Sequence, residues 1–127
     1  MHSSAILNLN KFFSIYLKNF NNPKILDFGS QSLSDHIGSK VLLDKMNIKY
    51  EYTGVDIEKG NNVDIVLGDP YSFKEIPDSA YDVIISTSVF EHVEFFWLTY
   101  LEILRILKPH GIFYFNVPSN GDFHRWP

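Results

Sequence analysis

A short apolar run that ends at an acid and then a glycine, residues 24–29, constrains the fold of this chain more than any other stretch. The run reaches Asp27, and Gly29 follows shortly after it. Open α/β sheets present nucleotide-like ligands at such a point, because the turn leaves backbone N–H groups unpaired at the carboxyl end of the strand. This interpretation predicts a second acid about 20 residues beyond the turn, and Asp56 ends the next apolar run. On this stretch alone, an ordinary strand and turn with an incidental acid is an equal alternative.

Strand-like runs alternate with helix-like segments along the chain. We expect strands at 24–28, 50–56, 63–67, 81–86 and 112–117, and helices at 5–20, 39–46 and 88–107. This alternation requires a mostly parallel sheet with right-handed crossovers. With the switch point beside the first strand, the predicted fold class is α/β, a doubly wound, mostly parallel sheet in the strand order 3-2-1-4-5.

Capping signals and periodicity add local detail to this outline. Ser39 is expected to be the N-cap of the second helix, and residues 88–91 have the spacing of a capping box for the third. The runs 63–67 and 82–86 are predicted to have buried character, and the latter to be buried on both faces of the sheet. The aromatic residues at 95–97 are expected in the core. The buried face of the third helix is predicted to contain Val93, Phe96, Trp97, Tyr100, Leu101, Leu104 and Leu107.

A third acid follows the third strand-like run, where Gly68 precedes Asp69. In the expected strand order, Asp27, Asp56 and Asp69 fall along one rim of the sheet, because the carboxyl ends of parallel strands share an edge. Acids at three successive strand ends favour a ligand site over a chance arrangement.

The length and composition of the chain indicate one globular domain, which we divide into an N-terminal helix (1–22), a core (23–121) and a tail (122–127). At 127 residues, of which 45% are hydrophobic, the chain can bury a sizeable core. The net charge of −4 gives no general attraction for phosphate backbones, which argues against a nucleic-acid partner. No stretch reaches the roughly 18 apolar residues of a membrane span. The absence of cysteine excludes disulfides, thiolate zinc sites and cysteine nucleophiles, and fits a cytoplasmic location.

Five short motifs follow one another along the chain: Ile25-Leu-Asp-Phe-Gly29, Tyr52-Thr-Gly-Val-Asp56, Gly68-Asp69, Tyr81-Asp-Val-Ile-Ile-Ser-Thr-Ser-Val-Phe-Glu-His92 and Leu107-Lys-Pro-His-Gly111. In this order and spacing they resemble class I S-adenosylmethionine-dependent methyltransferases of the type 11-like kind. The resemblance spans residues 24–121, and the stretch 116–127 is similar to a bacterial subgroup associated with surface-polysaccharide gene clusters. It implies a Rossmann-like fold, S-adenosylmethionine as the cofactor, and methyl transfer to a small-molecule or saccharide acceptor in polysaccharide biosynthesis.

The resemblance also implies where the cofactor binds. Asp27 and the Gly29 turn would face its methionine end, Asp56 would accept hydrogen bonds from the ribose hydroxyls with Ile57 against the adenine, and Asp69 would meet the adenine amino group. The implied cofactor-binding residues are Asp27, Gly29, Ser30, Gln31, Asp56, Ile57, Asp69, Pro70, Ser86, Thr87 and Ser88, the last three on the floor where the methyl group is transferred.

Methyl transfer from a sulfonium is an in-line displacement, so the protein mainly supplies positioning and a base for the acceptor. His92 and, in the tail, His124 are candidate bases, because an ordinary imidazole pKa of about 6.5 suits that task. Alternatively, His92 is only a polar residue in the first turn of the helix. Glu91 is interpreted as the acid of the capping box. Asn120, His124 and Arg125 in the tail are candidate acceptor-binding residues. No metal is predicted, because the Glu-His pair lacks a third nearby ligand.

Two other functions remain open. A non-catalytic methyltransferase-fold module that binds cofactor or a partner is one, since positions 31 and 33 carry Gln31 and Leu33 where the family usually has glycine. An NAD(P)-dependent sugar-modifying oxidoreductase is the other. Such enzymes typically carry Gly-x-Gly-x-x-Gly after the first strand and a Tyr-x-x-x-Lys motif, and this sequence contains neither.

The end of the sheet is expected to be unusual. Class I methyltransferases usually add two strands after the fifth, and the resemblance implies that this chain lacks them and has weak or no transferase activity. The run 112–117 would then be an edge strand without lysine or internal proline. Such an edge is a template for pairing with another chain, so self-association through 112–117 is expected.

Overall fold

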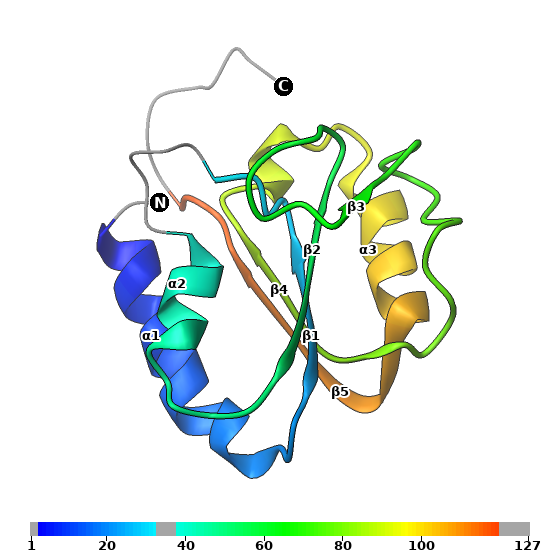
Figure 1. Ribbon diagram of the computed structural model, residues 1–127. Coiled ribbons are helices and arrows are strands. Elements are labelled where there is room, and N and C mark those ends of the chain that lie inside the picture. The colour runs from blue at the N-terminus through cyan, green and yellow to red at the C-terminus, as the bar shows by residue number, and fades with distance from the viewer. Residues whose placement is uncertain (1–2, 33–37, 120–127) are drawn as a thin grey trace.

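The computed structural model describes residues 3–32 and 38–119 and arranges them as one central sheet between two layers of helices (Figure 1). In chain order its elements are α1 (Ser3–Tyr16), η1 (Leu17–Asn19), β1 (Lys24–Phe28), α2 (Ser39–Asp44), β2 (Glu51–Asp56), β3 (Ile65–Val66), β4 (Tyr81–Thr87), η2 (Phe90–His92), α3 (Phe96–Ile106) and β5 (Leu107–Asn116), where η marks a 3₁₀ helix. The strands pair in parallel in the order β3-β2-β1-β4-β5. The predicted fold class and strand order are confirmed. Within the described residues, none of the helices has both the length and the apolar character needed to cross a membrane.

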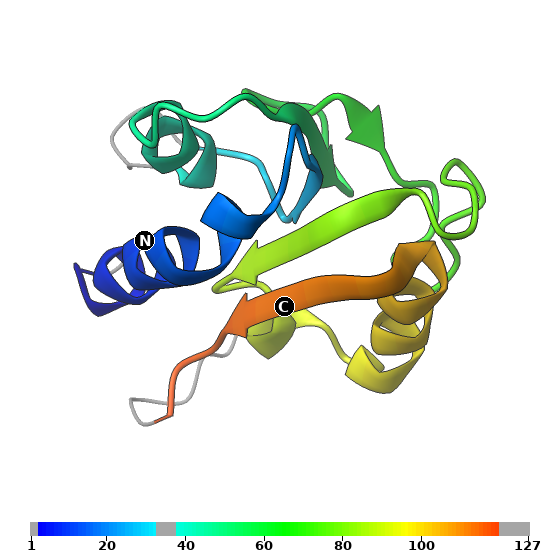
Figure 2. The same cartoon turned by 90° about the horizontal axis from the view of Figure 1, so that it is seen from below.

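Helices α1 and α2 cover one face of the sheet, as both views show (Figure 2). Leu9 and Phe13 of α1 and Leu43 of α2 pack in one cluster with Ile25 of β1 and Ile85 of β4, and all five side chains are fully buried. The N-terminal helix expected from periodicity therefore exists, as α1 continued by η1. Burial of its apolar stripe fixes it against the sheet.

Helix α3 covers the opposite face, but it turns a different side to the sheet from the one predicted. Its buried residues are Thr99, Ile103 and Ile106. Trp97 and Leu101, which belong to the predicted face, are instead 51% and 60% exposed. Periodicity indicated the wrong side because the polar residues Thr99, Glu102 and Arg105 share the inward-turned side of the helix, where Glu102 and Arg105 hydrogen-bond the loop before β4. Other large side chains that the sequence placed in the core but that are exposed are Phe95, Phe96, Tyr100 and Leu104.

Both predicted helix starts are wrong. Gly38 rather than Ser39 is the N-cap of α2, and the Ser39 side chain instead hydrogen-bonds the carboxyl of Asp27. The predicted capping box does not cap a helix, because the backbone at Ser88 is left-handed, with φ of 58°. The 3₁₀ helix η2 follows, and α3 begins only at Phe96, after an N-cap residue whose side chain makes no capping hydrogen bond.

The third strand is shorter and more exposed than predicted. Only two residues form β3, and Val66 is 44% exposed. The expected buried character of 63–67 is therefore wrong for all of the run except Leu67, because β3 lies at an edge of the described sheet and has a strand neighbour on one side only. The same expectation is confirmed for the central strand β4, in which residues 83–86 are all buried.

Candidate functional site

The turn after β1 is fastened to the end of β2, at the carboxyl edge of the sheet. The N–H groups of Gly29 and Ser30 both donate to the carbonyl of Val55, at 2.8 and 3.1 Å. Gly29 has φ of 79°, and a Cβ atom there would lie 2.1 Å from Cγ2 of Val89. The turn therefore needs glycine, and it packs directly on the segment that follows β4.

Asp56, at the end of β2, ties two loops together. One oxygen, Oδ2, accepts the N–H of Gln31 at 3.1 Å, and the other, Oδ1, accepts the N–H groups of Ile57 and Glu58 at 2.8 and 3.3 Å. A carboxylate offers about four acceptor positions, so the side chain can still accept a hydroxyl from a ligand. The predicted residues Gln31, Asp56 and Ile57 therefore lie together at one point of the sheet edge.

The loop after β2 folds back on its own strand at Gly54. The Asp64 carboxylate accepts the Gly54 N–H at 2.7 Å, and the Asp64 N–H donates to the Gly54 carbonyl at 2.8 Å. A Cβ atom on Gly54 would lie only 1.7 Å from the carbonyl oxygen of Asn62. This close approach of backbone to backbone fixes the rim beside Asp56.

Asp27 ends β1 beneath the turn rather than on the open rim. Its carboxyl accepts the Tyr52 hydroxyl at 3.0 Å and is 3% exposed. Burial raises the pKa of Asp27 to about 7, the hydrogen bonds from Tyr52 and Ser39 lower it, and the Asp56 charge raises it. Asp27 therefore lies near the carboxyl end of β1, on the expected rim of the sheet, but its side chain is buried there and bonds to Tyr52 and to Ser39 of α2.

Asp69 and Pro70 follow β3 in a loop that is fixed to α3. The Asp69 side chain is exposed and accepts the N–H of Tyr71 at 2.8 Å, which closes a local turn. The carbonyl of Pro70 accepts the hydroxyl of the buried Thr99 at 2.8 Å. These contacts hold the loop at the same edge of the sheet as Asp56.

Two hydroxyls in this region are buried without a hydrogen-bond partner among the described residues. They are Oγ of Ser30, after β1, and Oγ of Ser86, near the end of β4. The two residues are 6% and 1% exposed. A buried polar group without a partner costs free energy, so such groups call for an explanation, and a ligand that supplies the partner is one. Both serines belong to the predicted cofactor-binding set.

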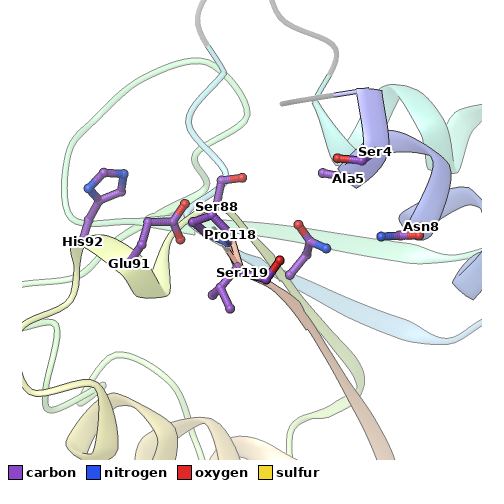
Figure 3. Close-up of a pocket in the computed structure, with 10 residues that line it drawn as sticks. Ser4, Ala5, Asn8, Ser88, Glu91, His92, Pro118 and Ser119 are labelled. Carbon is purple, nitrogen blue, oxygen red and sulfur yellow. The ribbon is translucent and has the colours of Figure 1, made fainter. Parts of the chain in front are cut away.

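A pocket of about 570 Å³ lies between α1, the segment after β4 and the end of β5 (Figure 3). This volume is typical of small-molecule sites. The predicted residues Ser88 and His92 both line it, whereas the predicted acceptor residues Asn120, His124 and Arg125 lie outside the described residues. The lining is mostly polar: Ser4, Asn8, Ser88, Glu91, His92, Asn116 and Ser119, with Ala5, Val117 and Pro118.

Glu91 differs from the rest of the lining, because one oxygen of its carboxylate is buried and unpartnered. No described residue donates to its Oε2, and Figure 3 shows the carboxylate extending toward Ser88. Neither this environment of Glu91 nor the position of Asn8 and Asn116 in the pocket was predicted from the sequence. The only indication of Glu91 in the sequence was an acid shortly after the end of a strand, and the capping-box spacing offered a different explanation for that acid. In the described part of the chain, no group of three or more His, Cys, Asp or Glu side chains could hold a metal ion.

Comparison with known proteins supports this architecture. A family model described as a methyltransferase domain matches residues 37–115, and no curated protein matches the chain. A candidate S-adenosyl-L-methionine-dependent methyltransferase from Methanococcus maripaludis superposes with a TM-score of 0.66 at 21% identity, covering 87% of this chain and 53% of that one. The [4+2]-cyclase SpnF gives 0.67 at 18% identity, with 85% and 43% covered. The trans-methyltransferase CalH, solved with S-adenosylhomocysteine, gives 0.63 at 17% identity, with 87% and 35% covered. The chain thus spans about half of these proteins or less.

Proposed function

This chain belongs to the methyltransferase-domain family, and from that premise we propose that it transfers a methyl group from S-adenosylmethionine to a small-molecule acceptor. The observation that carries the proposal is the set of polar groups at the carboxyl ends of β1, β2 and β4. There the Gly29 turn is bonded to β2, Asp56 can still accept a hydrogen bond, and the hydroxyls of Ser30 and Ser86 have no described partner. These groups suit a ligand with hydroxyls, an amino group and a carboxylate.

The residues at these strand ends would each contact a different part of the cofactor. Asp56 would accept the ribose hydroxyls with Ile57 beside the adenine, and the loop at 69–70 would meet the amino edge of the adenine. The turn at 29–31 and the acid beneath it, Asp27, would face the methionine end, and the residues 86–88 would lie near the reacting carbon. When bound, the cofactor supplies an activated methyl group, so the chain itself contributes binding, orientation and exclusion of water.

His92 is the residue that we propose to take the proton from the acceptor. It lines the pocket beside Glu91, and a neutral imidazole is a suitable base near pH 7. A saccharide acceptor, in polysaccharide biosynthesis, is the finer proposal. It is supported by the similarity of the tail to that subgroup, and Asn120, His124 and Arg125 would then contact the acceptor from the tail.

Replacing Asp56 with alanine should weaken the binding of S-adenosylhomocysteine about tenfold or more, as measured by calorimetry. A hydrogen bond to a charged group contributes roughly 1.5–3 kcal/mol, and tenfold corresponds to about 1.4 kcal/mol. Asp44→Ala is the matched control, since it removes an exposed carboxylate at the last residue of α2. Unchanged affinity in a folded Asp56→Ala protein would contradict the assignment. Cofactor binding without methyl transfer to any acceptor would favour the non-catalytic alternative.

We also propose that the protein self-associates through residues 112–117. Strand β5 lies at an edge of the described sheet, and Phe115 near its end is 52% exposed. We expect the mass measured by light scattering to rise above that of the monomer with concentration, and Phe115→Lys to reduce the effect. Val66→Lys on the opposite edge strand is the control. A monomer at all concentrations would contradict the proposal.

A further inference from the structure

The polar pocket adjoins the segment that packs on the turn proposed to face the cofactor. Ser88 lines the pocket, and its N–H donates to the carbonyl of Asn116 at 2.9 Å, which joins the segment after β4 to the end of β5. The next residue, Val89, lies against Gly29 of the turn after β1. A molecule in the pocket would therefore lie on the other side of residues 88–89 from the turn that faces the cofactor.

The unpartnered carboxylate indicates what kind of molecule fits. Oε2 of Glu91 is buried, and it accepts no hydrogen bond from the described residues. A carboxylate oxygen left in this state costs folding free energy, because that atom has lost water without gaining a donor. Such a cost is typical of functional sites, where a ligand supplies the missing partner. The missing partner must be a hydrogen-bond donor, either a hydroxyl or a protonated amine.

The other groups that line the pocket further restrict the kinds of ligand that fit it. Asn8 on α1, Asn116 on β5 and Ser88 offer amides and a hydroxyl, which both donate and accept hydrogen bonds. Among the described lining residues there is no lysine or arginine to neutralise an anion, and no aromatic ring apart from the His92 imidazole on which a flat acceptor could stack. A carboxylate or phosphate on the ligand would instead meet Glu91 at close range and be repelled.

We propose that this pocket binds the methyl acceptor, and that Glu91 accepts a hydrogen bond from it and selects hydroxyl-rich acceptors that are neutral or cationic over anionic ones. This inference rests on the proposed methyl-transfer function. It assigns acceptor selection to Glu91, with Asn8 lining the pocket from α1.

Three simple pyranoses that differ in charge test the proposal: glucosamine, glucose and glucuronic acid at pH 7. Their dissociation constants are measured by ligand-observed NMR with the full chain saturated with S-adenosylhomocysteine. We expect glucosamine and glucose to bind at least about tenfold more tightly than glucuronate. Glu91→Gln should weaken glucosamine about tenfold and remove most of the discrimination against glucuronate, because a neutral amide neither repels an anion nor pairs with a cation.

Two further variants separate binding from structure. Glu94→Gln makes the same change of charge at an exposed position that does not line the pocket, and it should leave all three constants unchanged. Asn8→Leu should weaken all three sugars from the opposite wall while leaving the affinity for S-adenosylhomocysteine intact. Thermal unfolding gives the last readout: Glu91→Gln should melt no lower than the natural protein, since a neutral amide replaces a carboxylate whose Oε2 is buried without a donor.

The possible failures are distinguishable. If S-adenosylhomocysteine binds but glucuronate binds as tightly as glucose, or none of the sugars binds, the inference is overturned and the proposed function stands. The inference also fails if Glu91→Gln lowers the melting temperature while the order of sugar affinities stays the same, because Glu91 would then be structural. If S-adenosylhomocysteine itself does not bind the natural chain, the proposed function fails, and the inference fails with it.

Discussion

A single added carbon at Gly54 should destabilise this protein more than any other substitution of comparable size. In Gly54→Ala, the new Cβ atom would lie 1.7 Å from the carbonyl oxygen of Asn62 and 2.7 Å from Oγ of Ser30. The first of these atoms belongs to the backbone and cannot rotate away. The hydrogen bonds of 2.7 and 2.8 Å between Gly54 and Asp64 hold the two segments together, so relief requires their loss. We expect the free energy of unfolding to fall by about 3 kcal/mol or more, at the upper end of overpacking costs.

Urea denaturation monitored by circular dichroism measures this loss, and Gly68→Ala provides the matched control. At Gly68 the nearest atom to an added Cβ is the end of the Glu75 side chain at 3.4 Å, an ordinary contact with a flexible group. The control should change stability by less than about 1 kcal/mol. Because β2 carries Asp56 at its end, Gly54→Ala should also lose affinity for S-adenosylhomocysteine. Equal midpoints for Gly54→Ala and Gly68→Ala would show that the loop moves aside freely.

The parts of the fold that the sequence predicted well are those that local chemistry determines. The turn after β1 needs glycine because its backbone has positive φ and packs on Val89. The sequence motif around Gly29 therefore predicts this turn directly. The strand order followed from the alternation of elements and from the handedness of crossovers, which few alternatives satisfy. The strand ends and the acid Asp56 were therefore predictable without knowledge of tertiary contacts.

The orientation of α3 was not predictable in this way. Thr99, Glu102 and Arg105 form a polar stripe along this helix, so the hydrophobic pattern indicated that the opposite, apolar side faces the sheet. The orientation is set by residues 88–95, which form a left-handed turn and a 3₁₀ helix instead of the first turns of α3. As a result Thr99 faces inward and hydrogen-bonds Pro70, while Trp97 faces solvent.

The polar pocket could not be predicted from the sequence, for a different reason. Asn8, Glu91 and Asn116 lie far apart in the sequence, and only the completed sheet with α1 packed on it brings them to one pocket. Glu91 also satisfied a simpler local pattern, the capping box, which the structure does not form. A local pattern that is satisfied by chance can thus conceal a residue whose environment is set by tertiary contacts.

The buried acid Asp27 should make the stability of this protein depend on pH, and Asp27→Asn should largely remove that dependence. The pKa of Asp27 is about 7 in the folded state, against an ordinary value of 3.8, chiefly because burial disfavours the charged form. Between these two values the folded chain keeps a proton that the unfolded chain has lost. The free energy of unfolding therefore decreases as pH rises through this window, and it levels off above about pH 7.

The size of the effect follows from the two pKa values. A difference of about three between them corresponds to on the order of 4 kcal/mol. Asparagine resembles the protonated acid and does not titrate. Thermal and urea unfolding should therefore show Asp27→Asn to be more stable than the natural protein at pH 8, by a few kcal/mol, with the difference shrinking toward zero near pH 4. Parallel pH profiles for the two proteins would contradict the assignment.

The groups that face Asp27 supply a second, independent test. Tyr52 donates to the carboxyl at 3.0 Å, and its own pKa is raised by burial and by Asp27, so it remains a donor throughout this pH range. Its hydrogen bond favours the ionised acid, as does that of Ser39, whereas the Asp56 charge opposes it. Tyr52→Phe should therefore move the end of the pH-dependent loss of stability to higher pH, whatever it does to stability overall. A shift to lower pH would mean that Tyr52 does not stabilise the charged form of Asp27.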